Sequence, residues 1–422
     1  MKMEVLLNDG RRSQYSIPQC NDPVTLGNRH SDLRVIANSV FLIEDLINNG
    51  SSMNEVNIPL RSNYSPNLND IIERLIEFLF KKIIKINLVK ETQSRLQEIP
   101  DNFTDGYTCL FSGGLDSFSG ILNSKMHYGQ VKGAFTVHAD QKYLCKLINQ
   151  LQVKVLSKHG IDVRTINSEK NKDYTRVTRG LLYVFNSLLL ENTNIIISEV
   201  GPTMHQPRFT LLDDITFTTH PKVITFSKKI AEEVLGQKIK IIEPNANLTK
   251  SEVAANSPEK SFIKTTCSCR TSRFCNSKYP NGDSCYGCVT RKLAMLVADI
   301  DDGTYRNDIL ISRVDGKERN KLQYNNILHL LQFSLQCLED IDSLPWYTAE
   351  MIKDYRKEDL FNRYSMDNFA GIYVLTQKKK IVDPIIQKKY EESLKVISKE
   401  QLQNRIEEVR ELKFKPDFSI EV

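Results

Sequence analysis

Between about residues 105 and 300, short apolar runs alternate with longer stretches whose apolar residues recur every three or four positions. The short runs predict β-strands, and the longer stretches predict amphipathic helices. Strand and helix in repeated alternation are typical of a parallel sheet covered by helices on both faces, so we expect an α/β core here. The expected strands cover 107–111, 133–137, 161–166, 194–197 and 238–242, and the expected helices include 142–158 and 177–190.

The chain on either side of this core has different patterns. The first hundred residues mix strand-like apolar runs with helical periodicity, which predicts an α+β region, and beyond about residue 300 the helical pattern predominates. We therefore divide the chain into an α+β extension over 1–100, the core over 101–300 and a mainly helical extension over 301–422. The elements expected in the two extensions are strands at 4–7 and 56–60 and helices at 32–47, 69–82, 326–338 and 388–412.

The most informative stretch of the core is Ser112-Gly113-Gly114-Leu115-Asp116-Ser117, which joins a predicted strand to a predicted helix. At such a junction, paired glycines let backbone N–H groups converge on an anion, and the helix adds the positive end of its dipole. Ser112 and Ser117 carry hydroxyls that donate to phosphate oxygens, whereas the Asp116 carboxylate suits a bridging Mg2+. The stretch has neither the lysine ending of a Walker A loop nor the spacing of a dinucleotide-binding loop. It predicts a nucleotide phosphate site; the alternative is an ordinary Gly-Gly turn before a capped helix.

Other polar residues are expected to lie beside this stretch. The carboxyl ends of neighbouring parallel strands share one edge of a sheet, and ligands bind there. The residues around His138 and the turn around Glu199 each follow a predicted strand, so we expect them at that edge. Arg176 and Arg179, about one helical turn apart, suit a phosphate or carboxylate, although surface arginines at this spacing usually pair with acids. Lys250, at an expected helix start, would place an ammonium beside phosphates, or would be an exposed lysine after an N-cap.

A cluster of cysteines marks the later part of the core. Five of the nine cysteines lie between positions 267 and 288, and the last two are separated by two residues. This spacing matches a tetrahedral zinc site with four thiolate ligands. We choose Cys269, Cys275, Cys285 and Cys288 as the ligands and keep Cys267 as an alternative first ligand. Four thiolates close the coordination shell, so the zinc is expected to be structural. The alternative is a group of reduced, buried cysteines.

The overall composition limits the classes of protein. The 422 residues carry 57 basic and 52 acidic side chains, a net charge of +5 that is too small to indicate nucleic acid by itself. The first residues carry charges where a signal peptide needs an apolar run, and no later apolar run approaches membrane-spanning length. We therefore expect a cytoplasmic protein with no membrane partner and no strong signal for nucleic acid.

Three motifs together resemble a known family. The stretch 112–117 is similar to the pyrophosphate-binding loop of the ATP-pyrophosphatase (PP-loop) superfamily. With the Leu-Thr-Lys-Ser-Glu-Val segment at 248–253 and the late cysteine cluster, the chain resembles 7-cyano-7-deazaguanine synthase (QueC) over roughly residues 105–298. The resemblance implies a Rossmann-like PP-loop fold that binds the phosphates of ATP and Mg2+ at 112–117. It also implies that Asp116 and Lys250 are catalytic and that the four chosen cysteines hold a structural zinc.

The sequence departs from this family where the family binds its deazaguanine substrate. The synthase's Pro-Gly-Arg-Asn segment is replaced by the stretch that holds Arg176 and Arg179. A second segment of the substrate pocket is replaced by the turn that begins at Glu199, and a loop over 276–284 is inserted between two cysteines. The ATP half is retained and the acceptor half is altered, so these two arginines and Glu199 become candidates for binding the substrate.

Long QueC-like proteins with added terminal regions resemble those of bacterial antiphage systems, the Qat system and type IV CBASS. This resemblance implies an ATP-dependent ligase that adenylates the carboxylate of 7-carboxy-7-deazaguanine, releases pyrophosphate and AMP, and forms an amide on a partner protein of the same defence system. Two alternatives stay open: a 7-cyano-7-deazaguanine (preQ0) synthase that uses ammonia, and a non-catalytic ATP-binding scaffold. The two extensions would be docking surfaces for the partner, or would only stabilise the core.

Overall fold

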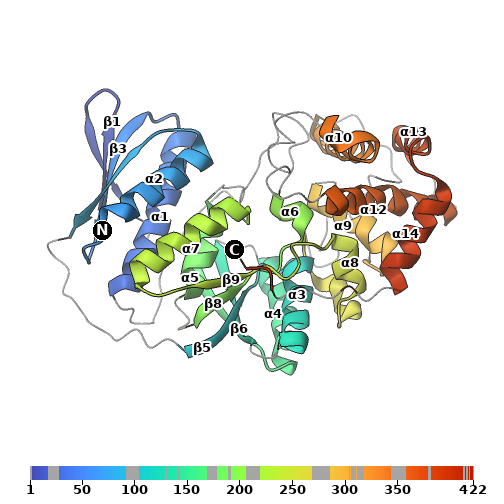
Figure 1. The fold of residues 1–422 in the computed structure, drawn as a ribbon, viewed down its shortest axis with the longest axis horizontal. Helices are drawn as coiled ribbons and strands as arrows, with labels where there is room; N and C mark the ends of the chain where they lie inside the picture. Colours follow the sequence, from blue (N-terminus) through green and yellow to red (C-terminus); the bar gives the residue numbers. More distant parts are fainter. Residues whose placement is uncertain are drawn as a thin grey trace.

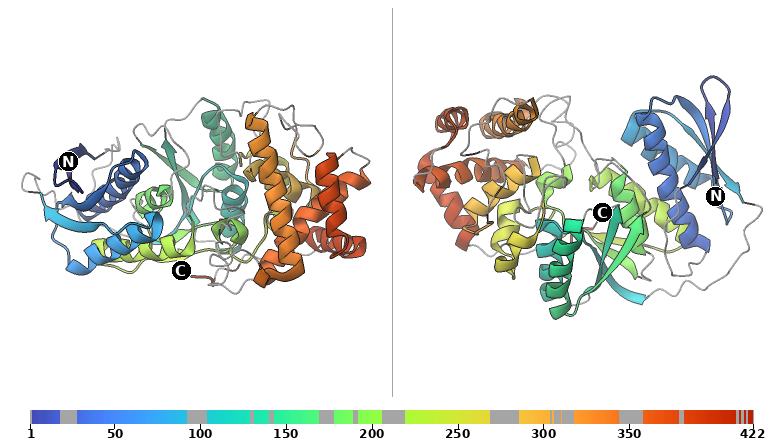
Figure 2. Two further views of the ribbon diagram at one scale, coloured as in Figure 1. Left: turned by 90° about the horizontal axis from the view of Figure 1, so that it is seen from above. Right: turned by 180° about the vertical axis from the view of Figure 1, so that it is seen from behind.

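The computed structural model has three groups of elements in a row: a mixed sheet with two helices at one end, a parallel sheet in the middle, and a cluster of helices at the other end (Figure 1). The same order is visible from above and from behind (Figure 2). The structure describes residues 2–17, 28–91, 104–128, 131–139, 143–168, 178–188, 192–205, 219–268, 286–303, 305, 310, 318–343, 358–378, 382–411, 414, 417 and 419–421.

Five parallel strands of the described chain form the middle sheet, in the order β7-β6-β5-β8-β9. β5 is central, with its Cys109 opposite Ala134 of β6 on one side and Ile196 of β8 on the other. The chain runs outward from β5 to β6 and β7 and then crosses to β8 and β9, so the direction of strand addition reverses between β5 and β8. The strands are β5 (Thr104–Leu110), β6 (Val131–Ala139), β7 (Asp162–Ser168), β8 (Asn192–Ile196) and β9 (Lys240–Ile242).

Alternate residues of these strands point to opposite faces of the sheet. Leu110 and Ile195 belong to one hydrophobic core, whereas Cys109 and Ile196 belong to another. The predicted parallel sheet with helices on both faces is therefore confirmed. The helices on the first face are α5 (Arg179–Ser187) and α7 (Pro221–Leu235), and those on the second face are α3 (Leu115–Tyr128) and α4 (Tyr143–Lys158).

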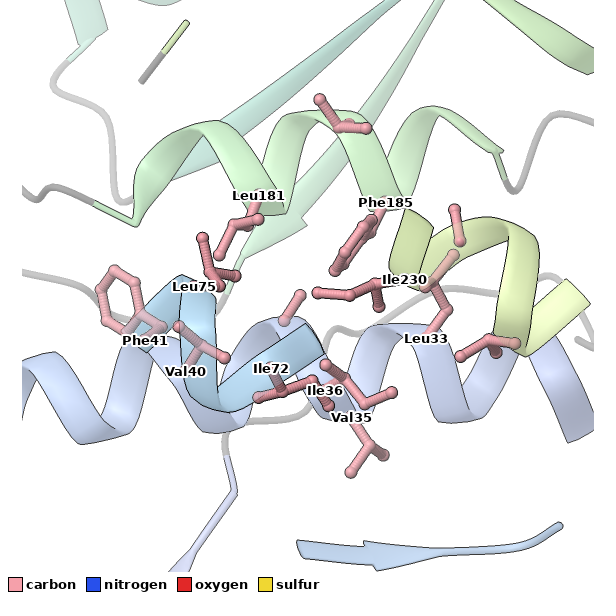
Figure 3. Close-up of a cluster of buried hydrophobic side chains, with 14 of the residues drawn as sticks. Leu33, Val35, Ile36, Val40, Phe41, Ile72, Leu75, Leu181, Phe185 and Ile230 are labelled. Atoms are coloured by element: carbon pink, nitrogen blue, oxygen red, sulfur yellow. The ribbon is translucent and has the colours of Figure 1, made fainter. Parts of the chain in front are cut away.

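The amino-terminal elements form a four-stranded sheet in the order β2-β1-β3-β4, in which β3 pairs antiparallel with β1 and parallel with β4. Its helices α1 and α2 pack against α5 and α7 of the middle region, where Leu33 and Ile72 lie in one cluster with Phe185 and Ile230 (Figure 3). The two regions thus share one hydrophobic core. The elements are β1 (Lys2–Leu7), β2 (Arg12–Ser16), α1 (Asn28–Asn48), β3 (Met53–Leu60), α2 (Pro66–Phe80) and β4 (Lys85–Lys90).

The carboxyl-terminal helices share a different core with two helices that follow the middle sheet, α8 and α9. α12 is central in this group, since it packs on α9, α10 and α14. The elements after β8 and β9 are α6 (Gly201–His205), α8 (Lys250–Ala255), η2 (Lys260–Thr265), α9 (Tyr286–Val297), α10 (Glu318–Asp340), η4 (Ile341–Ser343), α12 (Glu358–Gln377), α13 (Pro384–Ser393) and α14 (Lys399–Glu411).

The prediction of one helix over 388–412 is wrong, because α13 ends at Ser393 and α14 begins at Lys399. The Ser398 N–H donates to Gln401 Oε1 at 2.8 Å, and the Gln401 N–H donates to Ser398 Oγ at 3.1 Å. This reciprocal pair is a capping box, which fixes a new helix start at that point.

Candidate functional site

The turn after β5 adopts a compact form that its glycines permit. Gly113 has a φ of +77°, in the left-handed region that favours glycine. Ser112 Oγ and Ser117 Oγ lie 3.1 Å apart, and Ser117 Oγ donates to Gly114 O at 3.1 Å. α3 begins at Leu115 and runs for 14 residues. Two hydroxyls and the positive end of a helix dipole therefore meet at one point, which is an anion-binding arrangement.

Two neighbouring segments hold this turn in place. The Cys267 N–H donates to Gly113 O at 3.0 Å. Gln152, a buried residue of α4, donates through Nε2 to the same carbonyl at 3.2 Å and to Thr265 O at 3.0 Å. The first residues of the cysteine cluster are thus hydrogen-bonded to the back of the turn.

Three ionisable side chains from different parts of the chain meet beside the turn. Asp116 lies in the first turn of α3, Glu199 follows the end of β8, and Lys250 is the first residue of α8. Lys250 Nζ forms an ion pair with Asp116 Oδ2, and each of these two side chains is only 11% exposed. The expected meeting of the segments that follow β5 and β8 therefore occurs at the switch point of the sheet, where parallel sheets bind ligands.

Glu199 has a strongly perturbed carboxyl group. Burial and, to a smaller degree, the neighbouring Asp116 carboxylate raise its pKa, the Lys250 ammonium opposes both effects, and the resulting pKa is about 8. Perturbed carboxyls of this kind gather at functional sites more often than elsewhere. The raised pKa favours the protonated form of Glu199 at neutral pH.

Asp116 fits a role as a magnesium ligand. No N–H group and no hydroxyl of the described chain donates to its buried Oδ1 atom, while Oδ2 faces Lys250 and the Glu199 carboxyl lies beside the pair. Mg2+ is bound by one or two protein carboxylates together with phosphate oxygens and water. Among the residues that the structure describes, no group of three metal-binding side chains comes together. Asp116 and the neighbouring Glu199 are therefore the two carboxyl groups that the described residues bring to this site.

The other residues predicted to bind substrate are placed only in part. Arg176 lies outside the described residues. Arg179 begins α5, the helix that links β7 to β8, so its backbone lies toward the carboxyl edge of the sheet; its side chain is not described. His138 pairs in register with Asn167 of β7, one residue before β6 ends.

Of the cysteines proposed as zinc ligands, Cys288 lies in the first turn of α9 and is buried, and Cys267 is partly buried beside the turn after β5. Cys269, Cys275 and Cys285 lie outside the described residues. The assignment of these four cysteines as zinc ligands therefore stays a prediction.

A buried arginine joins the two ends of the cysteine cluster. Arg291 of α9 is fully buried and forms a bidentate pair with Asp302, with a shortest distance of 2.5 Å from Nη2 to Oδ1. Its Nη1 donates to Thr266 Oγ1 at 2.6 Å and its Nη2 to Ile263 O at 2.7 Å. A Cβ on Gly287 would come within 2.4 Å of Ser268 O. The segments before and after the cluster are thus fixed side by side.

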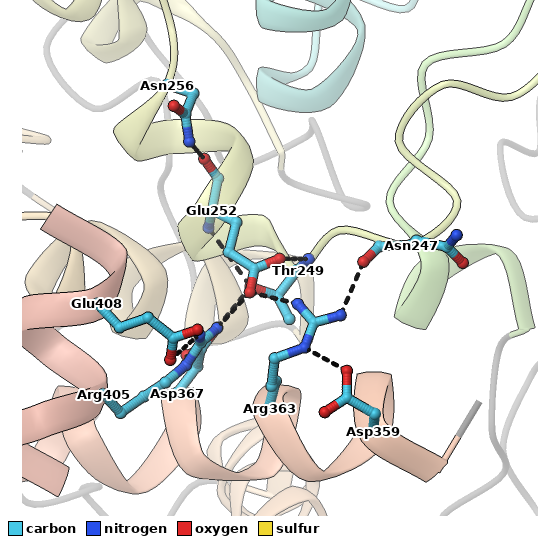
Figure 4. Close-up of polar contacts among 9 residues, drawn as sticks. All are labelled: Asn247, Thr249, Glu252, Asn256, Asp359, Arg363, Asp367, Arg405 and Glu408. Carbon is cyan, nitrogen blue, oxygen red and sulfur yellow. Dashed lines mark hydrogen bonds and ion pairs between the residues drawn. The ribbon is translucent and has the colours of Figure 1, made fainter. Parts of the chain in front are cut away.

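A cluster of acids and arginines that the sequence analysis missed surrounds the start of α8 (Figure 4). We call Glu252, Arg363, Asp367 and Arg405 the acid–arginine cluster. Glu252 accepts bonds from Arg363 and from Arg405 Nη2, and Arg405 Nε donates to Asp367 Oδ1 at 2.8 Å. One signal was present in the sequence: Arg405 occupies a place in the apolar stripe of α14, between Leu402 and Val409.

Comparison with known proteins adds no family to these observations. No protein-family model matches the chain, and no curated protein sequence matches it. No helix within the described ranges has the length and apolar character that a membrane span requires. Function is therefore inferred from the geometry of the site and from the sequence motifs.

Proposed function

We propose that this protein is an ATP-dependent enzyme that activates a carboxylate by adenylation at the carboxyl edge of the middle sheet. One observation carries the proposal: an anion-binding turn after β5 lies next to a buried carboxylate, Asp116, that is paired with Lys250. Phosphates would bind the hydroxyls of Ser112 and Ser117 and the N–H groups at the start of α3. Mg2+, when bound by Asp116, would neutralise charge on the phosphates and on the leaving pyrophosphate.

The position of Lys250 supports this proposal, because its ammonium could exchange the Asp116 carboxylate for nucleotide phosphates. In the free protein its ammonium balances Asp116. Nucleotide phosphates would compete for that ammonium, and Lys250 would then stabilise the charge that develops on the phosphates. The substrate carboxylate attacks the α-phosphorus, the bond to pyrophosphate breaks, and an acyl adenylate forms. An amine then attacks the acyl carbon, AMP leaves, and the amine loses one proton as the amide forms.

The identity of the substrate is proposed from the QueC-like motifs. We propose 7-carboxy-7-deazaguanine as the carboxylate and an amine of a partner protein, from the same antiphage system, as the acceptor. Glu199, Arg176 and Arg179 are the candidates for contacting this substrate. Glu199 is favoured by its position, since it interacts with both Asp116 and Lys250.

A structural zinc held by Cys269, Cys275, Cys285 and Cys288, with Cys267 as the alternative first ligand, is part of the proposal. It is supported by the way Arg291 fixes the segments on either side of the cluster. Metal analysis of the purified protein should give one zinc per chain, and a Cys288→Ser variant should lose it. Wild-type protein purified without zinc would refute the four-cysteine assignment.

The function is tested by incubating the protein with Mg-ATP and 7-carboxy-7-deazaguanine, with ammonia or with proteins encoded by neighbouring genes. Pyrophosphate and AMP release is followed together with the masses of small molecules and proteins. Pyrophosphate release with a deazaguanine mass on a partner protein supports the ligase. A nitrile formed from ammonia alone would identify a preQ0 synthase, and ATP binding without pyrophosphate release would identify a scaffold.

A further inference from the structure

Glu252 is an acidic residue of α8 with no exposure to solvent. Its hydrogen-bond partners come from the N-cap of its own helix and from two carboxyl-terminal helices. Its Oε2 atom accepts the Thr249 N–H at 2.9 Å. Its Oε1 atom is shared by Arg363 and by Arg405, whose Nη2 lies 2.6 Å away. The two arginines belong to α12 and α14, so the carboxyl-terminal helices supply the positive charge for an acid of the middle region.

Asp367 of α12 completes the arrangement. It accepts the Thr249 hydroxyl at 2.6 Å on Oδ2 and Arg405 Nε at 2.8 Å on Oδ1. Arg405 also donates to Glu408 Oε2 at 2.8 Å, on the same helix. Arg405 therefore bridges two buried carboxylates, and each of them is bonded to Thr249.

These contacts converge on the residue pair that sets the start of α8. Thr249 is the N-cap and Glu252 the N3 residue of a capping box, in which each side chain bonds to the backbone of the other. Lys250 lies between them, and its ammonium reaches Asp116. A displacement of the capping box would carry Lys250 with it.

α12 also contacts the second polar segment of the site. Gly201, two residues beyond Glu199, begins α6, and a Cβ on it would lie 2.5 Å from Leu360 Cδ2. Leu360, Arg363 and Asp367 recur at helical spacing on α12, so one face of this helix supports both segments.

Stability alone does not account for such a cluster. Buried ion pairs lose much of their attraction to the cost of removing charges from water, and apolar side chains of the same volume often stabilise a fold as well. What charged side chains add is directional hydrogen bonding, because Arg405 fixes two carboxylates in a defined geometry.

We propose that Arg405 and Asp367 are positioning residues, which act through the capping box of α8 to hold the Lys250 ammonium at the phosphate site. The proposal rests on the proposed function in that Lys250 is taken to act on ATP. It also assigns a role to the carboxyl-terminal helices, which become a part of the nucleotide site.

The test uses two variants, Arg405→Gln and Asp367→Asn, and compares each with wild type. The asparagine in Asp367→Asn keeps the shape of the side chain and an acceptor for the Thr249 hydroxyl. Arg410→Gln is the matched control, because Arg410 lies on the same helix and donates to Val297 O at 2.9 Å, away from α8. Circular dichroism and thermal unfolding establish that each variant is folded. If Arg405→Gln fails to fold, Asp367→Asn decides the outcome.

The first readout needs no activity. The protein is treated with limiting acetic anhydride, and acetylation of Lys250 is followed by mass spectrometry, with the exposed Lys264 as an internal reference. Both variants should acetylate Lys250 faster than wild type and Lys264 at the same rate, whereas the control should match wild type. Unchanged acetylation of Lys250 in a folded variant would overturn the proposal.

The second readout is steady-state pyrophosphate release. Because a small misplacement of a catalytic group costs up to about 100-fold in rate, kcat should fall by about 10- to 100-fold, while KM for ATP stays within about twofold of wild type. A rise in KM with kcat unchanged would contradict a positioning role. Wild-type protein that releases no pyrophosphate would refute the proposed function, and the acetylation result would still decide whether the cluster positions Lys250.

Discussion

At the scale of single residues, Asp116 and Lys250 neutralise each other before any nucleotide binds. On the proposed function, incoming phosphates would compete for the ammonium, and the carboxylate would then be free to bind a cation. The ion pair seen in the free protein would thus be one of two pairings of the same two side chains.

We predict that Asp116→Asn lowers pyrophosphate release by about 100-fold or more, because it removes the charge that would hold the cation while keeping the size of the side chain. The measurement is pyrophosphate release at saturating Mg-ATP. Asp162→Asn is the control, since Asp162 is an exposed acid at the start of β7 whose side chain is 74% accessible. Undiminished turnover in folded Asp116→Asn would eliminate Asp116 as a catalytic residue.

The raised pKa of Glu199 predicts a pH effect on stability. The native carboxyl has a pKa of about 8, above the ordinary value of 4.5, so between these values the native state binds more protons than the unfolded state. The contribution of Glu199 is fully present below about pH 4.5 and is lost as the pH rises through about 8. Urea unfolding without Mg2+ or nucleotide should show wild type losing stability relative to Glu199→Gln across that range. Parallel profiles for the two proteins would contradict the raised pKa.

Residues of the site differ in how far the sequence could reveal them. The stretch 112–117 is contiguous, so its glycines and hydroxyls could be recognised as a turn. The position of Glu199 beside it was predicted from the rule that parallel strands share a carboxyl edge. Arg405 could not be paired with its acid, because the partners lie 153 positions apart and no local pattern links them. The Thr-x-x-Glu signature of the capping box was visible, but which helices would contact it depends on tertiary packing.

At the scale of elements, α3 packs directly against the segment that follows β8. A Cβ on Gly120 would lie 2.1 Å from Ser198 Cβ, closer than two carbon atoms can approach. The helix that begins after the 112–114 turn is therefore held against the segment that carries Glu199, with only hydrogen atoms of the glycine between them.

We predict that Gly120→Ala destabilises the protein by about 1–3 kcal/mol, because the added methyl group forces α3 away from that segment. The double variant Gly120→Ala with Ser198→Gly removes the opposing Cβ and should recover part of the loss. Urea unfolding of the two single variants and the double variant measures the coupling. Strictly additive effects would mean that the two positions do not touch.

The same scale shows which elements a sequence pattern can reveal. The apolar, buried ends of β5 and β8, residues 107–110 and 195–196, were predicted, whereas the polar residues with which the two strands begin, 104–106 and 192–193, were not. β2 is the polar sequence Arg12–Ser16 at the edge of its sheet, with three of its five residues exposed, so no apolar alternation marked it. In the same way, the break between α13 and α14 depends on a capping box, not on hydrophobic periodicity.

At the scale of the whole molecule, the amino-terminal region and the middle region share one hydrophobic core. Polar contacts reinforce it: the Thr178 hydroxyl donates to Glu44 at 2.6 Å, and both residues are buried. Arg29 of α1 donates to Leu235 O at 2.8 Å, at the end of α7. The two regions are therefore expected to unfold together.

We predict that Phe185→Ala, in the middle of that core, lowers stability by about 3–5 kcal/mol. Native-state hydrogen exchange should then show peptides from β3 and from β5 opening with the same reduced free energy. Val89→Ala is a suitable control, since Val89 is an apolar residue of β4 that is 40% exposed. Exchange of β3 at a free energy independent of the Phe185 substitution would show that the amino-terminal region folds on its own.

The acid–arginine cluster has a consequence for synthesis on the ribosome. Lys250 and its capping box are translated long before Arg405, which follows Glu252 by 153 positions. Until α14 emerges, the nascent chain has the turn after β5 and Lys250 but lacks Arg405, which holds the capping box of α8 through Glu252. On the proposed function, a chain released before α14 would therefore consume ATP more slowly than a chain that includes this helix.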